Sequence, residues 1–355
     1  MNFKKFSIIL IFLGLADAIP MDFRKDVPAD EILSFTQPAE EVESVAYRLP
    51  NDTRPIRYDV FLKTDVHNGG EAEFKGRVKI EIVVLQTTNE ITIHQRLLTI
   101  ERIDIFYSTN VLLQSDITYE ENKEAEFLII PTTTLLSSGN RYIIEITYRG
   151  LLRDDNLGFY RSSYKNPSNE NVFIATTQFE QTDARHAFPC YDEPQIRAVF
   201  GISIEHDKSY NAISNWPMIS SLPSNGNYVV TKFNDTEPVQ SYLIAFVVSD
   251  FEFVENDAFK KQRVYAKPQS ITNNEAALAL DAGQKILDKY VEHFGIDYAP
   301  PKLDQVAVPD FDAGAMENWG LVTYREEYLL YNKELATTRQ RENILTVITH
   351  EYAVS

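Results

Sequence analysis

Short runs with strand-like patterning fill most of this chain and constrain its fold more than any other feature. Apolar and polar side chains alternate at 79–83 and 142–148, and turn-forming residues separate such runs at 67–70. No helical pattern of convincing length interrupts them between residues 47 and 253. The pattern therefore predicts an N-terminal all-β domain over residues 47–254, built as a sandwich or as open curved sheets. The expected strands are 56–64, 78–85, 90–94, 103–107, 126–130, 141–148, 171–179, 198–205 and 241–248.

The pattern changes near residue 255. Apolar residues recur with helical spacing at 274–294, and Gly295 follows as the expected cap of that helix. A second helix is expected at 337–355. Mixed helix and strand patterns predict that an α/β domain occupies residues 255–355. Its expected strands are 263–266, 305–308 and 320–324.

The first 46 residues show the features of a secreted protein. Two lysines precede the apolar run 6–15, and Ala16-Asp17-Ala18 fits a cleavage site, so residues 1–18 are predicted to be a signal peptide. Residues 19–46 are rich in Pro, Asp and Glu and are predicted to be a flexible leader. Glycosylation sequons at Asn51 and Asn234 agree with a secreted, extracellular location. No other apolar run approaches the roughly 18 residues of a membrane span, so the mature chain is expected to lack one.

Charge and cysteine content exclude several classes of function. The formal net charge is −18, which argues against nucleic acid as a partner. Cys190 is the only cysteine, so an internal disulfide is impossible, and a buried apolar role is expected for it rather than a nucleophilic one. The sequence has no Gly-x-Ser-x-Gly motif and no glycine-rich phosphate loop.

The pair His350-Glu351 lies in the last expected helix, where Thr337 and Gln340 have the spacing of a capping box. In zinc peptidases such a pair opens the motif His-Glu-x-x-His, in which two histidines share one helix face and the glutamate acts as a base. Val354 stands at the fifth position here. The pair alone is a weak signal, since His-Glu is common by chance.

Other motifs in the chain strengthen this signal. The sequence contains Gly-Ala-Met-Glu-Asn at 314–318, and with the segments 47–50, 158–162, 177–185 and 188–194 it resembles the aminopeptidase N family of zinc-dependent gluzincin aminopeptidases. The resemblance covers residues 47–353. It implies that residues 255–355 form the N-terminal part of a thermolysin-like catalytic domain, truncated inside the His-Glu-x-x-His motif.

The resemblance also implies roles for individual residues. Glu317, Gln178 and Glu180 would bind the amino terminus of a peptide, whose ammonium group favours charge-assisted hydrogen bonds with carboxylates. The backbone of Gly314, Ala315 and Met316 would hold the peptide like an added strand. His350 would be the first zinc ligand and Glu351 the base acting on zinc-bound water.

The same resemblance raises an objection to catalysis. Val354 cannot coordinate zinc, and the family's third ligand, a glutamate on a following helix, is not in this sequence. We therefore expect zinc binding to be doubtful and this chain, as written, to be inactive.

Three hypotheses remain open at this point: a secreted zinc aminopeptidase that releases N-terminal amino acids from peptides, a non-catalytic secreted binder of peptides or proteins, and an incomplete product of a longer gene. The last is favoured over the second, because divergence from the family motif begins abruptly at Val354. Membrane anchorage is expected only in a full-length form.

Overall fold

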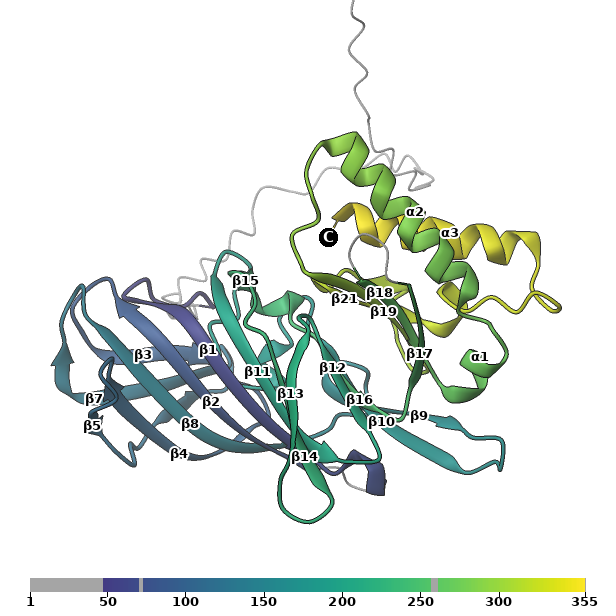
Figure 1. Cartoon of the computed structure of the whole chain (residues 1–355). Coiled ribbons are helices and arrows are strands. Elements are labelled where there is room, and N and C mark those ends of the chain that lie inside the picture. Colours follow the sequence, from purple (N-terminus) through teal and green to yellow (C-terminus); the bar gives the residue numbers. More distant parts are fainter. Residues whose placement is uncertain (1–46, 70–72, 257–260, 355) are drawn as a thin grey trace, which may run out of the picture. The chain divides into compact units, whose positions relative to one another are not determined.

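The computed structural model describes residues 47–69, 73–256 and 261–354. These residues belong to one compact unit, Val45–Ser355. The predicted signal peptide (1–18) and leader (19–46) lie outside the described residues. The fold class is the predicted one, since strands dominate up to residue 249 and an α/β arrangement follows (Figure 1). No helix in the described ranges is long and apolar enough to cross a membrane.

The first part of the chain is built on a large sheet whose strand order is β13-β14-β11-β1-β2-β8-β4-β5, with β15 also paired to β11. Its long strands alternate buried residues with exposed or half-buried ones, as β2 does from Phe74 to Val84. Pairing brings like residues together, so that Ile80 lies opposite Ile144 and Val78 opposite Ile146. The strands are β1 (Thr53–Thr64), β2 (Glu73–Val84), β4 (Thr99–Tyr107), β5 (Leu112–Gln114), β8 (Arg141–Leu151), β11 (Arg197–Asp207), β13 (Met218–Pro223), β14 (Tyr228–Phe233) and β15 (Val239–Gln240).

Two smaller sheets complete this all-β part. One has the order β3-β7-β6, with β3 (Thr88–His94), β6 (Glu120–Asn122) and β7 (Phe127–Leu136). The other has the order β12-β16-β10-β9, with β9 (Gly158–Lys165), β10 (Asn171–Gln178), β12 (Asn211–Ser214) and β16 (Phe246–Ser249). Aromatic rings fill the space between the sheets, where Phe159 packs edge-to-face on both Phe74 and Phe246.

The last part of the chain forms a sheet of order β17-β18-β19-β21-β20. Helices α2 and α3 contact each other and lie on one face of it (Figure 1). Its core includes Val264, Leu303, Val322, Ile344 and Ile348. The elements are β17 (Glu252–Asn256), β18 (Lys261–Ala266), α1 (Pro268–Thr272), α2 (Ala277–Phe294), β19 (Lys302–Val308), β20 (Ala315–Met316), β21 (Leu321–Arg325) and α3 (Thr338–Val354).

The predicted helices are present, and one predicted strand is wrong in part. Gly295 closes α2 with a left-handed φ of 66°, and Thr337 Oγ1 accepts a 3.1 Å hydrogen bond from Gln340 N at the start of α3. The strand expected at 241–248 forms only from Phe246. Its first residues are a 3₁₀ turn, η3 (Ser241–Leu243), because buried side chains bind the backbone and hydroxyl groups of this segment.

Candidate active site

Glu317 lies in the tight connection between β20 and β21. Met316 pairs with Thr323, and the buried Asn318 Nδ2 donates to Thr323 Oγ1 at 3.1 Å. Leu321 N also donates to Asn318 O at 2.9 Å. These bonds hold the loop closed, so the half-buried Glu317 side chain starts from a fixed backbone. The asparagine of Gly-Ala-Met-Glu-Asn therefore has a structural part in placing the glutamate before it.

Gln178 and Glu180 lie at the end of β10 in the all-β part. Gln178 is the last residue of that strand and is buried, and its Oε1 has no hydrogen-bond partner among the described residues. Glu180 follows two residues later and is exposed. A buried amide oxygen without a partner is unfavourable, which makes it a ready acceptor for a donor brought by a ligand.

Glu180, Glu317 and Glu351 converge, although they come from three distant segments. Burial, then the charges of Glu317 and Glu180, raise the pKa of the Glu351 carboxyl from 4.5 to about 7. Burial and Glu317 likewise raise the pKa of Glu180. The charges of Glu317 and Glu180 act on the buried Glu351, so the three carboxylates lie near enough to interact. The structure thus brings together three of the residues singled out from the sequence.

His350 and Val354 lie one turn apart near the end of α3, and both side chains are exposed. Val354 is an aliphatic residue with 51% of its surface accessible. Within residues 47–69, 73–256 and 261–354, no cluster of three His, Cys, Asp or Glu residues could hold a metal ion. A catalytic zinc needs three protein ligands, so the described residues do not fit one.

Gly314, Ala315 and Met316 border the sheet edge beside Glu317. Arg325 N donates to Gly314 O at 3.0 Å, and Ala315 pairs with Tyr324. In the described part of the chain β20 has β21 as its only strand neighbour, so its other edge is unpaired. Such an edge offers backbone groups to an extended peptide.

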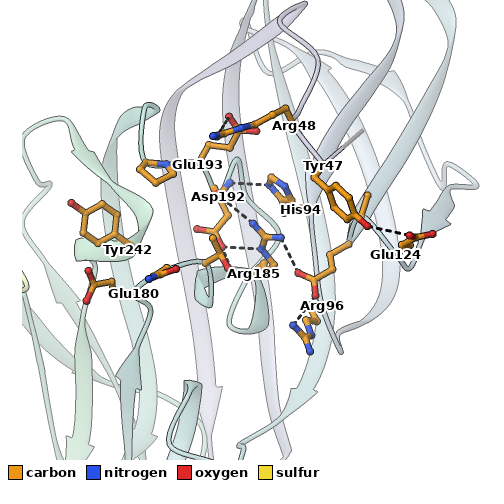
Figure 2. A pocket seen from close by; sticks show the side chains of 15 residues that line it. Tyr47, Arg48, His94, Arg96, Glu124, Glu180, Arg185, Asp192, Glu193 and Tyr242 are labelled. Carbon is orange, nitrogen blue, oxygen red and sulfur yellow. Dashed lines mark hydrogen bonds and ion pairs between the residues drawn. The ribbon is translucent and has the colours of Figure 1, made fainter. Parts of the chain in front are cut away.

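Tyr242 is a member of this site that the sequence did not reveal. It lies in η3, and burial followed by the charges of Glu317 and Glu180 raises the pKa of its phenol. Figure 2 shows it next to Glu180 at one end of a cavity of about 730 Å³. No motif marks this tyrosine in the sequence, because its place depends on contacts made through the fold.

A buried ion network forms the wall of this cavity (Figure 2). Arg185 donates to Asp192 Oδ2 at 3.0 Å and to Glu126 Oε2 at 2.8 Å, and Ser241 Oγ donates to Asp192 Oδ1 at 2.6 Å. His94 Nδ1 accepts from Asp192 N at 3.2 Å, and burial together with Arg185 lowers the pKa of His94 to about 3. His94 is therefore neutral. Arg185 belongs to the segment 177–185 and Asp192 to the segment 188–194, so their ion pair links two of the motifs seen in the sequence.

The two sequon asparagines, Asn51 and Asn234, are exposed, while the threonines that complete the sequons are buried. Thr236 Oγ1 accepts from Phe200 N at 2.9 Å. Glycosylation at either position stays a prediction.

Comparisons with known proteins agree with these observations. Residues 54–243 match the model of the peptidase M1 N-terminal domain, and residues 278–355 match that of the peptidase family M1 domain. The chain is 38% identical over 309 residues to endoplasmic reticulum aminopeptidase 1 of Rattus norvegicus and 37% identical over 323 residues to aminopeptidase N of Bos taurus. It is also 37% identical over 322 residues to aminopeptidase Ey of Gallus gallus.

Each of these matches covers 86% of this chain and 33% of the relative, so the chain spans about one third of the length of these proteins. The all-β part corresponds to the N-terminal domain of such enzymes, and the α/β part to the beginning of their catalytic domain. The N-terminal domain match alone extends over more than half of the chain. This chain belongs to peptidase family M1, the family of aminopeptidase N.

Proposed function

We propose that this chain carries the part of a zinc aminopeptidase site that binds the amino terminus of a peptide. The observation that carries the proposal is the convergence of Glu180, Glu317 and Glu351. The charges of Glu180 and Glu317 disfavour the ionised form of the buried Glu351, and a cation among the three carboxyls relieves that repulsion. A peptide's terminal ammonium supplies both the charge and the hydrogen-bond donors.

The surrounding residues support an extended peptide as the ligand. Gln178 Oε1, two residues before Glu180 in the chain, is a buried acceptor without a partner among the described residues. The free edge of β20, at Ala315 and Met316, supplies backbone groups on which the peptide would lie as an additional strand.

Catalysis requires more than these residues supply. A pKa of about 7 suits Glu351 to accept a proton near neutral pH, the role that the family resemblance gives it. The family's zinc chemistry needs three protein ligands, which the described residues do not supply. His350 is the one family ligand present among the described residues, because Val354 replaces the second. We therefore assign amino-terminus recognition to this chain and propose that it has little or no peptidase activity of its own.

The test is a comparison of two ligands that differ only at their amino terminus. We expect a short apolar peptide with a free amino terminus to bind the wild-type chain about tenfold or more tightly than its N-acetylated form, because acetylation removes a charge-assisted hydrogen bond. Isothermal titration calorimetry at pH 7 measures both affinities. Equal affinities would overturn the proposed function.

A second candidate function is that of a non-catalytic secreted binder of peptides. Val354 favours it, since an aliphatic residue at the second ligand position disables zinc binding and leaves the carboxylates intact. The two candidates predict the same preference for free amino termini. Both also assign little or no peptidase activity to this chain, so turnover of amino-acid amides with bound zinc would contradict both.

Val354→His is expected to raise zinc affinity by more than about tenfold, because two histidines one helical turn apart can share a metal ion. The bound fraction is measured by titration with a zinc-sensitive dye. The matched control is Thr349→His at an exposed position next to His350 in sequence, where the two side chains do not share one helix face. Equal zinc affinity in the two variants would contradict the assignment of His350 as a ligand.

We further propose that the protein is secreted and extracellular. The sequence pattern of a signal peptide at residues 1–18 supports this location, as do the exposed Asn51 and Asn234. The similarity to a protein named for the endoplasmic reticulum agrees with entry into the secretory route.

The proposed division into domains at 47–254 and 255–355 rests on the change of sequence pattern near residue 255. The α/β sheet itself begins at Glu252.

A further inference from the structure

The proposed amino-terminus site is assembled from two parts of the chain. Gln178, Glu180 and Tyr242 belong to the all-β part, whereas Glu317 and Glu351 belong to the α/β part. Charge-assisted hydrogen bonds require distances held to a few tenths of an ångström. The way in which these two parts are joined near the site therefore decides whether the site forms.

Asn215 is one of the residues that join the two parts, and it does so at the loop that carries Glu317. It follows β12, and its side chain is almost completely buried, with 1% of its surface accessible. Asn215 Nδ2 donates to Leu243 O at 2.8 Å and to Trp319 O at 2.9 Å, and Asn215 Oδ1 accepts from Ala245 N at 2.8 Å. One amide side chain thus uses both of its donor hydrogens and its acceptor within the protein.

The partners of Asn215 are the segments that carry the site. Leu243 is the residue after Tyr242, and Trp319 lies two residues after Glu317. The bonds to Leu243 O and Ala245 N also explain why this segment turns away from the predicted strand. The bond to Trp319 O crosses from the all-β part to the α/β part and ends on the loop that holds Glu317.

The backbone of Asn215 is equally close to this loop. A Cβ built on Gly320 would lie 2.3 Å from Asn215 O, and Gly320 has a φ of 83°, so only glycine fits. On the α/β side, Gly320 O accepts from Lys302 Nζ at 2.7 Å and from Asp304 N at 3.1 Å. Bonds to β19 therefore fix the loop on its own sheet. Asn215 binds the same loop from the all-β part, so it fixes the loop relative to that part as well.

We propose that Asn215 is a positioning residue for amino-terminus recognition, holding Tyr242 and Glu317 in register across the junction of the two parts. The inference rests on the proposed function. Asparagine is the side chain that suits this place, because aspartate would lose both donors and put a charge against two carbonyl oxygens. An aliphatic side chain would leave two carbonyls and one N–H buried without partners.

The chain contains its own spectroscopic probe of this junction. The sequence has two tryptophans. Trp216 follows Asn215 in the chain, and Trp319 supplies the carbonyl oxygen that Asn215 binds. Their ring centroids are 6.0 Å apart. Rings at that distance couple, so the near-ultraviolet circular dichroism of the indoles reports whether the junction is closed. This signal does not depend on any ligand.

The experiment compares Asn215→Ala with wild type and with Tyr58→Phe. The control removes a different buried hydrogen bond, from Tyr191 N to Tyr58 Oη at 3.0 Å, inside the all-β core. Two quantities are measured for each protein: the indole dichroism, and the affinity ratio between a free and an N-acetylated peptide. We expect Asn215→Ala to lose the coupled indole signal and to reduce the ratio by about tenfold, while affinity for the acetylated peptide is unchanged. Tyr58→Phe should keep the indole dichroism and the affinity ratio of the wild type.

A wild-type-like affinity ratio in folded Asn215→Ala would overturn the inference. Should alanine prevent folding, Asn215→Ser, which keeps one hydrogen-bonding group, is measured in the same way. Loss of the fold in both variants while Tyr58→Phe folds would also overturn it, because Asn215 would then hold the fold rather than the site. If the wild type itself showed no preference for the free over the N-acetylated peptide, the proposed function would be wrong. The indole dichroism would still show whether Asn215 joins the two parts.

Discussion

Arg185→Met is expected to lower the free energy of unfolding by about 3–5 kcal/mol, the range found when one partner of a buried ion pair is removed. Arg185 is buried, and Asp192, with 2% of its surface accessible, receives hydrogen bonds from Arg185 and Ser241. Methionine fills the volume of the arginine stem but supplies no donor. Asp192 would then be left as a buried charge with too few partners, and Glu126 would lose one of its two arginine partners.

Urea unfolding followed by far-ultraviolet circular dichroism measures this loss. The matched control is Arg141→Met, which removes an exposed ion pair with Glu81 and should change the free energy by about 0.5 kcal/mol or less. The network explanation would be wrong if the two variants unfolded at the same urea concentration.

The second large effect is a dependence of stability on pH that Glu351 creates. Its pKa is about 7 in the folded protein and 4.5 when unperturbed, so the folded state binds a proton more tightly than the unfolded state. This contribution stabilises the protein fully below about pH 4.5 and is lost as the pH rises towards 7. A difference of about 2.5 pKa units corresponds to about 3 kcal/mol.

Glu351→Gln is therefore expected to be more stable than wild type above pH 7, by up to about 3 kcal/mol, with little difference near pH 4. The difference between the two proteins isolates this carboxyl from every other titrating group. Urea midpoints measured from pH 4 to pH 8 give the profile, and Glu342→Gln, on the exposed face of the same helix, serves as the control. A constant difference across that range would show that the carboxyls do not interact as described.

The sequence predicted the long elements well because their signals are local. The helix α2 ends at Gly295 and α3 begins after Thr337, both as capping chemistry requires. Strands such as β13 and β20 were missed for physical reasons. β13 is almost wholly exposed, so it has no alternation to detect, and β20 consists of only two residues.

The candidate site was predictable where a motif carried it and not where the fold did. Glu317, Gln178, Glu180 and Glu351 could be named from their motifs, and the structure brings three carboxylates together. Tyr242 and Asn215 could not be named, since their parts in the site depend on contacts with backbone carbonyls and charges from distant segments.

The measurement that tests the central claim most directly is the effect of Glu317→Gln on recognition of an amino terminus. Calorimetric affinities are determined for one peptide in its free and N-acetylated forms, with wild type, Glu317→Gln and the exposed control Glu334→Gln. Glutamine keeps the size of the side chain and removes its charge. We predict that Glu317→Gln reduces the preference for the free amino terminus by about tenfold or more, whereas Glu334→Gln retains it. An unchanged preference in Glu317→Gln would contradict the account.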